Sequence, residues 1–394
     1  MDWRKPEEKE RLVGRDFLLI CTSNTLAFSS IYLIIPVLPL FLEDIKGYSN
    51  FLIGTLMSML VVGALLRPYL GRASDIRGRK ELLVWGTLLL GVTNFLYAGF
   101  QTAAPLFVVR LVNGLGLAAF HTASYALIGD IVPAARRLHG IALFFISIDT
   151  AIGAAPLVAE AMRKAWGYDV VYYLAGGLAL LAFAVSNLVH ETRKEGATET
   201  ARKRTWIMPD PLQRAIFLMT TGYTFTMGAL STFVVLSTRE VGINEGELFF
   251  TVFAATLIIF RLGVGKRADW WPRRPLILVS GIIVLAGLAT IAFSSNLFTF
   301  ILGCLIYALG FAYVPTTLSA LLLDHTPTGD RGVMLGFFMA IFDVGIGLGG
   351  VAMGPIADAW GYPAMYLVAG AVALLCLSYF LLHTTRLREE ARLV

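Results

Sequence analysis

Two aspartates, Asp149 and Asp343, stand inside long uncharged stretches of the chain. Each interrupts a run of largely apolar residues that is long enough, at about 20 residues, to cross the hydrocarbon layer of a membrane as a helix. A charged side chain at the centre of such a helix costs about 2.5–3.5 kcal/mol on insertion scales. An acid held there must be protonated, paired or in contact with water. These two side chains are therefore candidates for binding and releasing protons.

A stripe of polar side chains runs along the apolar run predicted over residues 105–128. At 100° per residue its members share about 120° of the helix circumference, so they could line a cavity. The stripe comprises Arg110, Asn113, Gly114, His121 and Tyr125. His121 could relay protons because imidazole titrates near neutral pH, although a packed, hydrogen-bonded histidine is the more ordinary interpretation.

Aromatic and weakly polar side chains in four of the apolar runs could form a pocket for a small organic solute, or could pack helices together. The candidates are Asn24, Tyr32, Asn113, Tyr125, Tyr223, Met227, Tyr307, Phe311 and Tyr313. Both glutamines, Gln101 and Gln213, lie outside the runs. Because sugar hydroxyls need many amide partners, this composition favours an amphiphilic, lipophilic or cationic solute over a hexose.

The elements that position these residues must be membrane helices. Of the 394 residues, 57% are hydrophobic and 15% are charged, against about 25% charged in a soluble domain. Such a chain cannot coat itself with polar surface, which excludes a soluble globule, a disordered chain and a nucleic-acid binder. The three cysteines show no metal-ligand or disulfide spacing. We expect neither a metal nor another cofactor.

Twelve apolar runs are long enough to span the membrane, which predicts an all-α integral membrane protein. The predicted spans are 17–41, 51–70, 82–100, 105–128, 138–159, 169–190, 214–236, 247–264, 275–294, 297–322, 332–355 and 363–383. A charged, Thr- and Pro-containing linker over 191–213 divides them, so the predicted domains are two six-helix bundles at 1–190 and 214–394. Placing both termini in the cytoplasm puts 25 Lys and Arg residues in inner segments and four in outer loops, as the positive-inside rule requires.

The second half of the chain repeats the first with a constant offset of 194 residues. Matched residues include Gly116 with Gly310, Asp149 with Asp343, and the tripeptide WGY at 166–168 and 360–362. Because each half has six spans, both halves enter the membrane in the same direction, which predicts parallel repeats. The repeat is also asymmetric, since Cys304 stands where the first half has Arg110. Arg110 could thus pair with Asp149, leaving Asp343 as the titrating acid or as a polar packing contact.

Two inner loops and one helix start carry a family resemblance. The loop GRASDIRGRK at 71–80 resembles the G-x-x-x-D-x-x-G-R-K/R signature of the major facilitator superfamily, and GKRADWWPRR at 265–274 echoes it with Pro272 in place of the second glycine. The segment RLVNGLG at 110–116 is similar to the R-x-x-x-G-x-G motif of proton-coupled members. Of the superfamily's antiporter signature in the span at 138–159, only Gly140, Gly153 and Pro156 are present.

The resemblance implies a gate at the inner face that holds the outward-open state. Carboxylates near helix ends could cap a helix of the opposite half, while arginines reach acids at the inner ends of spans. The predicted gating residues are Gly71, Asp75, Gly78, Arg79, Lys80, Asp130, Gly265, Asp269, Arg273, Arg274 and Asp324.

We therefore expect a secondary transporter of the cytoplasmic membrane, most simply a proton-coupled exporter acting as a monomer. Its partners would be a small-molecule substrate, protons and the lipid bilayer, with no nucleic acid. A proton symporter or a uniporter for the uptake of a metabolite or sugar is the alternative. A membrane-embedded enzyme or receptor is a weaker one, since such short loops show neither a catalytic constellation nor a soluble domain.

Overall fold

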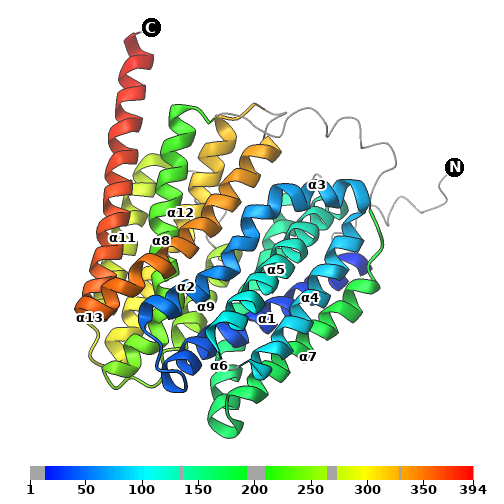
Figure 1. Ribbon diagram of the computed structural model, residues 1–394. Helices are drawn as coiled ribbons and strands as arrows, with labels where there is room; N and C mark the ends of the chain where they lie inside the picture. The colour runs from blue at the N-terminus through cyan, green and yellow to red at the C-terminus, as the bar shows by residue number, and fades with distance from the viewer. Residues whose placement is uncertain are drawn as a thin grey trace, which may run out of the picture. The chain divides into compact units, whose positions relative to one another are not determined.

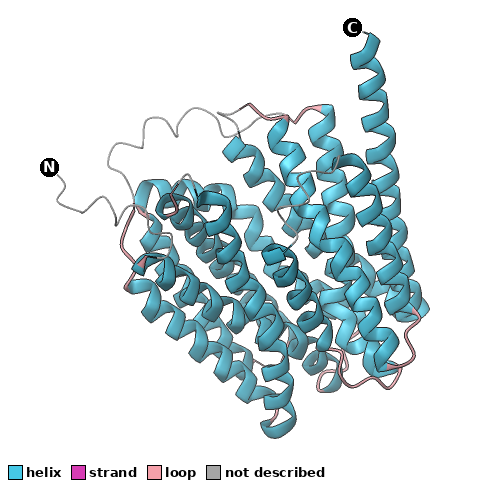
Figure 2. Ribbon diagram, turned by 180° about the vertical axis from the view of Figure 1, so that it is seen from behind, coloured by secondary structure: helices cyan, strands magenta, loops and turns pink. Residues whose placement is uncertain are grey.

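The computed structural model describes residues 14–100, 102–133, 136–192, 209–263, 273–327 and 331–393. Helices and the loops that join them make up this part of the chain, and no strand occurs in it (Figures 1 and 2). The helices of the first half are α1 (Arg15–Asp44), α2 (Asn50–Val62), α3 (Arg67–Arg77), α4 (Arg79–Gly99), α5 (Ala103–Ile131), α6 (Arg137–Trp166) and α7 (Tyr168–Asn187). Those of the second half are α8 (Pro211–Glu240), α9 (Leu248–Gly263), α11 (Arg273–Ala292), α12 (Leu297–Asp324) and α13 (Arg331–Leu393).

Each of the twelve predicted spans overlaps a helix, but two spans are built differently from the expectation. The second is broken by a 3-10 turn at Gly63–Leu66, which separates α2 from α3. The last two follow one another as α13 and are separated at Gly361, whose φ of 76° is not helical. Glycine reaches this left-handed region without the steric penalty of a Cβ, so it permits the reversal between the two spans.

Eight helices of the described residues are long and apolar enough to cross a membrane, and the segments Asn50–Leu66 and Leu248–Gly263 are shorter apolar helices. The 30-residue α8 is not among the eight, because threonine and serine lower its hydropathy. These hydroxyls bond the helix itself: Thr220 donates to the carbonyl of Ile216 at 2.8 Å and Thr224 to that of Thr220 at 2.8 Å. A hydroxyl satisfied in this way can be buried at little cost. The chain is a multi-pass membrane protein.

The helices pack into two compact units. One unit contains residues up to Ile34 and those from Leu66 to Lys203, and the other contains Ile35–Leu65 and the chain from Arg204 onward. The second half of α1 and all of α2 thus pack with the second half of the chain. This grouping reflects contacts in one conformation, whereas the predicted domains followed the sequence repeat, so the division at the linker stays a prediction.

In the first unit, α4 packs against α5, α7 and α3, and α6 contacts α7 and α5. The first half of α1 joins through hydroxyls, with the Oγ atoms of Ser23 and Ser186 2.7 Å apart. In the second unit, α13 packs against α8, α2 and α11, while α12 packs against α11 and α9.

A pair of glycines matched by the 194-residue repeat occupies corresponding helix crossings. A Cβ added to Gly116 of α5 would lie 3.1 Å from the carbonyl oxygen of Gly86 on α4. A Cβ added to Gly310 of α12 would lie 2.8 Å from the carbonyl oxygen of Ser280 on α11. Since Ser280 follows Gly86 by 194 residues, the same crossing is built twice. The repeat therefore extends from the sequence to the packing.

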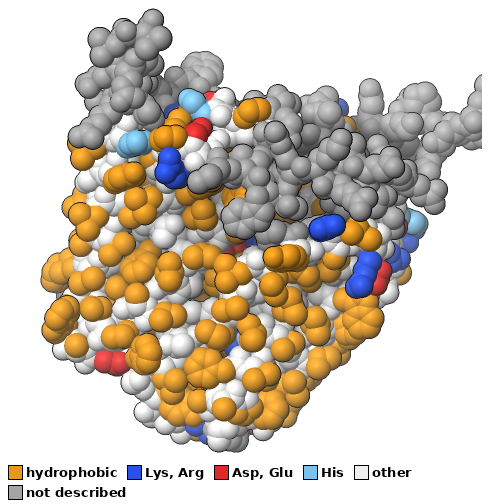
Figure 3. Space-filling model, turned by 45° about the horizontal axis from the view of Figure 1, so that its top comes forward, with side chains coloured by type: hydrophobic (Ala, Val, Ile, Leu, Met, Phe, Trp, Pro, Cys, Tyr) orange, Lys and Arg blue, Asp and Glu red, His pale blue; other side chains and the backbone are white. Residues whose placement is uncertain are grey.

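The surface agrees with a bilayer environment. On the described part of the face seen in Figure 3, hydrophobic side chains are widespread and few charged ones lie among them. Large apolar side chains such as Leu375 (71% exposed) and Phe298 (76% exposed) lie on the protein surface. Their exposure would be unfavourable in water and is favourable against lipid.

Candidate functional site

An aromatic cluster lies in the second unit and contains three of the predicted pocket residues. The ring centroids of Tyr223 and Phe311 are 5.1 Å apart, and those of Tyr307 and Phe311 are 5.8 Å apart. Phe342 of α13 joins them at 6.0 Å from Tyr223. These edge-to-face and stacked arrangements are the favourable ones for aromatic rings. The helices α8, α12 and α13 thus converge on one apolar, aromatic region.

The cluster contains hydroxyls as well as rings. The Tyr307 hydroxyl lies 3.0 Å from the Thr226 hydroxyl, so these two groups satisfy each other. The Tyr223 hydroxyl is buried and has no hydrogen-bond partner among the described residues. A buried tyrosine normally finds a partner, so this hydroxyl is the exception in the cluster, and its contact with a ligand stays a prediction.

Asp343 follows Phe342 directly on α13 and is half-buried, with its Oδ2 atom shielded from solvent. Asp343 is therefore the residue after a member of the cluster, and its side chain leaves α13 about 100° around the helix axis from that of Phe342. Met227 and Tyr313, two further predicted pocket residues, are not among the rings of this cluster. Met227 is buried on α8, and Tyr313 packs edge-on against Phe260 of α9 at 4.4 Å between centroids.

The first unit holds Arg110 and Asp149, both almost fully buried at 1% and 2% exposure. The Arg110 charge interacts electrostatically with the hydroxyls of Tyr97 and Tyr172, whose rings lie 5.7 Å apart. A guanidinium completely removed from water needs such polar surroundings. The ion pair between Arg110 and Asp149 stays a prediction.

Two asparagines predicted to face a cavity are engaged in helix packing. Asn113 donates to the Thr93 hydroxyl at 2.7 Å and to the Asn94 side-chain oxygen at 2.8 Å, which ties α5 to α4. Asn24 donates to the Ser147 hydroxyl at 2.8 Å, which ties α1 to α6. Both are fully buried. Their contact with a substrate stays a prediction.

Tyr125 and Tyr32 are half-buried, in contrast to these asparagines. The Tyr125 ring lies 6.2 Å from both Phe144 and Phe145 of α6. Its partial exposure leaves it able to contact a solute in this conformation.

His121 has a charged neighbour that the sequence did not reveal as its partner. Its Nδ1 atom lies 3.2 Å from the Arg67 guanidinium, and its ring packs edge-on against Phe28 at 5.4 Å. Because arginine has no acceptor, it must donate and Nδ1 must accept. The proton of the neutral imidazole is then on Nε2, and the adjacent positive charge opposes a second proton.

The ion pairs predicted at the inner ends of the helices are present. Arg79 is paired with Asp130, which also accepts a hydrogen bond from the Thr192 hydroxyl at 2.6 Å. Arg273 is paired with Asp324 at 2.8 Å. Each pair joins helices of the same unit, so it fixes a loop to the end of its own bundle. Arg274 donates to the Leu381 carbonyl at 2.7 Å and ties α11 to α13.

A carboxylate that the sequence did not single out caps the start of α4. Glu191 accepts hydrogen bonds from the backbone N–H groups of Arg79, at 3.2 Å, and Lys80, at 2.9 Å. These N–H groups have no partner within the helix and carry partial positive charge. Gly78 makes the approach possible, because its φ is 123° and a Cβ there would lie 2.6 Å from the Glu191 carboxylate.

This cap gives a physical reason for one departure from the family signature. The positions that repeat Gly78 and Glu191 in the second half are Pro272 and Thr385. The glycine is therefore absent where the carboxylate that requires it is absent. Gly265, Asp269 and the side chain of Asp75 lie outside the described residues, and a Cβ at Gly71 would meet only the Thr122 methyl group, at 3.9 Å.

Arg67, Glu191 and Phe342 are the site residues that sequence reasoning missed. Arg67 did carry a signal, since it is one of three arginines inside predicted spans. Glu191 begins the charged linker, where a single acid is inconspicuous. Phe342 is one of 26 phenylalanines and is marked only by its place beside Asp343.

Two sets of helices related by the 194-residue repeat, each with an acid inside an apolar helix and an ion pair at a helix end, are typical of a polytopic transporter. The family model of the Major Facilitator Superfamily matches residues 20–215 and 214–393. The chain belongs to this superfamily, and it is a transporter rather than an enzyme.

Sequence relatives and solved structures also belong to transporters. The chain is 27% identical to the staphylopine export protein of Staphylococcus aureus, over 91% of this chain and 93% of that protein. It is 26% identical to the multi-drug resistance efflux pump PmrA of Streptococcus pneumoniae, over 93% and 96%. The structure of a D-xylose-proton symporter superposes with a TM-score of 0.78 at 16% identity, covering 93% of this chain and 96% of that one. The last likeness concerns the fold alone.

Proposed function

We propose that this protein is a proton-coupled exporter of a small amphiphilic or cationic organic solute. It would work by alternating access, in which two six-helix repeats expose a central site first to one side of the membrane and then to the other. The proposal includes twelve spans, both termini in the cytoplasm, a division at 191–213, the cytoplasmic membrane as location and a monomeric state.

One observation carries the proposal: the half-buried Asp343 follows Phe342 on α13, and the Phe342 ring packs with Tyr223 and Phe311 in the aromatic cluster. Aromatic rings bind apolar and cationic groups. An intramembrane acid can bind either the cation or a proton, so the two would compete. Competition for one acid is the simplest way to exchange a solute for protons. The two efflux relatives support this direction.

A symporter or uniporter for uptake is the second candidate, favoured by the partial antiporter signature of α6, in which Asp149 stands where that signature usually has glycine. The purified protein can be screened by thermal shift against drugs, sugars, amino acids and metal-chelating compounds at two pH values. A ligand whose affinity falls as the pH is lowered supports competition at an acid.

Direction is then tested with that ligand in proteoliposomes. Exchange requires that a pH gradient, acidic on the outer side, drive the ligand outward against its own gradient. Counterflow that does not depend on the pH gradient would contradict proton coupling and indicate a uniporter. Accumulation of the ligand inside the proteoliposomes, driven by the same gradient, would establish symport.

A further inference from the structure

The helices α2 and α13 meet along a tight seam of small residues in the second unit. Gly54 faces the carbonyl of Gly350 so closely that a Cβ would have no room. Further along, a Cβ at Gly354 would lie 2.5 Å from the Asn50 carbonyl oxygen. The Ser58 hydroxyl donates to the Gly347 carbonyl at 2.8 Å. Such contacts bring two backbones together without large side chains between them.

The seam joins the two sequence repeats, because α2 belongs to the first and α13 to the second. It lies toward the helix ends that the charge distribution assigns to the outer side. Ser58 and Gly54 are buried in it. Outward opening in the proposed alternating access would part these helices, so the contacts at the end of the seam bear on its closure.

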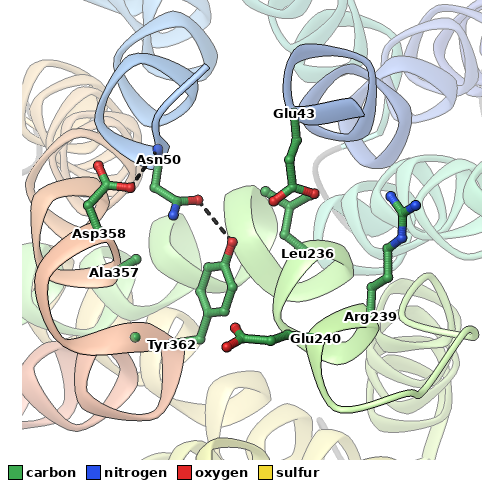
Figure 4. A pocket seen from close by; sticks show the side chains of 9 residues that line it. Glu43, Asn50, Leu236, Arg239, Glu240, Ala357, Asp358 and Tyr362 are labelled. Atoms are coloured by element: carbon green, nitrogen blue, oxygen red, sulfur yellow. Dashed lines mark hydrogen bonds between the residues drawn. The ribbon is translucent and has the colours of Figure 1, made fainter. Parts of the chain in front are cut away.

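One acidic side chain fastens the outer end of the seam. One carboxylate oxygen of Asp358 accepts a hydrogen bond from the backbone N–H group of Asn50 at 2.9 Å (Figure 4). The other accepts from the backbone N–H group of Phe51 at 3.0 Å. The Tyr362 hydroxyl donates to the Asn50 side-chain oxygen at 2.9 Å. Asp358 and Tyr362 belong to α13, and their partners begin α2.

These bonds complete the N-terminus of α2. The next two N–H groups are satisfied locally, since Leu52 donates to the Ser49 hydroxyl and Ile53 to the Ser49 carbonyl. The first two have Asp358 as their acceptor. Parting α2 from α13 therefore removes both acceptors and separates a carboxylate from the positive end of a helix.

The surrounding charges do not act on the first turn of α2. Glu43 and Glu240 line the same pocket (Figure 4). Arg239 of α8 is paired with Asp44 of α1 at 2.6 Å, which is a separate link between the two repeats. The position that repeats Asp358 in the first half is Lys164, which pairs with Glu160 on its own helix at 3.2 Å. A cation cannot accept from N–H groups, so this fastening is built in one repeat and not copied in the other.

We propose that Asp358 is a latch: its carboxylate holds the first turn of α2 against α13 and thereby sets the fraction of molecules in which this seam is closed. Asp358 acts as a positioning residue and needs no contact with substrate. The inference rests on the proposed alternating access, but the closure of the seam can be measured without transport.

The test uses a thiol as a reporter of the seam. Cys21, Cys304 and Cys376 are replaced by alanine or serine, and Ser58→Cys places a thiol of nearly the same size inside the seam. The rate at which a small membrane-impermeant thiol reagent, added outside intact cells, modifies this cysteine reports seam opening. We compare Asp358→Asn, which removes the charge and one acceptor, and Asp358→Lys, which places the repeat-related residue there.

We expect Asp358→Asn to raise the modification rate about 3- to 10-fold, the range expected for losing a carboxylate at a helix N-terminus. Asp358→Lys should raise it at least as much. The matched control is Asp169→Asn, an exposed acid in the first turn of α7, which should leave the rate within about twofold. Because Asp358 is itself exposed, its variants should elute normally in size-exclusion chromatography.

An unchanged rate in both Asp358 variants would overturn the latch, as would an equal rise in Asp169→Asn. The latch would also be overturned if the Ser58→Cys thiol, with Asp358 unchanged, reacted as fast as a fully exposed cysteine, because the seam would then not be closed. Substrate flux is measured separately. Absence of flux in all variants, with the rate differences present, would refute the transport proposal and leave the latch standing.

Discussion

The guanidinium of Arg67 lies 3.2 Å from Nδ1 of His121, so a permanent cation donates to the imidazole inside the first unit. The two residues come from α3 and α5 and are 54 positions apart in the chain. The sequence allowed two interpretations of His121, a proton relay or a packed, hydrogen-bonded side chain, and this contact distinguishes them. It favours a packed, neutral imidazole over a proton relay, because a protonated ring could not accept this bond.

The first prediction is that His121→Asn keeps the pH dependence of transport. The asparagine side-chain oxygen can replace Nδ1 as the acceptor for Arg67, whereas His121→Ala removes it. We expect the alanine variant to lose about 0.5–1.5 kcal/mol of stability, the usual net contribution of one hydrogen bond, because the contact is part-buried. Thermal unfolding of the two purified variants and a pH profile of flux check this. A profile flattened by His121→Asn would instead make the histidine a proton carrier.

The second prediction separates the two intramembrane acids. Asp343→Asn should abolish pH-driven transport while the protein stays folded, because Asp343 is an acid within a membrane helix that is only half-buried. Asp149→Asn is the matched variant at the repeat-related position, where the side chain is 2% exposed. Its main effect should be on stability, since a deeply buried charge needs its partners.

Flux with and without a pH gradient, measured together with the unfolding midpoint, distinguishes the two acids. Proton coupling that survives Asp343→Asn would rule out its assignment. Loss of coupling in Asp149→Asn at unchanged stability would exchange the roles.

The third prediction concerns Tyr307, which is fully buried and bonded to Thr226. Tyr307→Phe keeps the ring in the aromatic cluster and removes one buried hydrogen bond. We expect a loss of about 0.5–1.5 kcal/mol of stability and little change in ligand affinity. Tyr223→Phe is the contrast, because its hydroxyl has no partner among the described residues. It should weaken ligand binding and leave stability nearly unchanged, which thermal shift with and without ligand measures.

The helices could be predicted from sequence because a membrane demands long apolar runs, and each predicted span overlaps a helix. The break at Gly63–Leu66 could not, since no proline or charge stands within that turn. The polarity of α8 could have caused a membrane span to be overlooked. Its threonines lower hydropathy but bond their own helix, so length rather than composition identified it.

The candidate site was predictable in its residue types but not in its contacts. Periodicity placed Arg110, Asn113 and His121 on one side of a helix, yet it could not say whether that side faces a cavity or a neighbouring helix. Asn113 in fact bonds Thr93 and Asn94. The glycines at 347, 350 and 354 lie against α2. Their positions in the sequence do not indicate which helix packs against them, so this contact could be seen only in the folded structure. A single sequence does not encode such pairings locally.

The last prediction tests the cap on α4. Gly78→Ala should destabilise the protein by about 1–3 kcal/mol, because alanine resists a φ of 123° and its Cβ would lie 2.6 Å from the Glu191 carboxylate. Gly71→Ala is the matched control in the same loop signature, since its Cβ meets only a methyl group at 3.9 Å. Glu191→Gln keeps one acceptor and should cost less than Gly78→Ala. Unfolding midpoints of the three variants rank these effects, and a Gly71→Ala variant as unstable as Gly78→Ala would show that the loop tolerates no side chain for reasons unrelated to the cap.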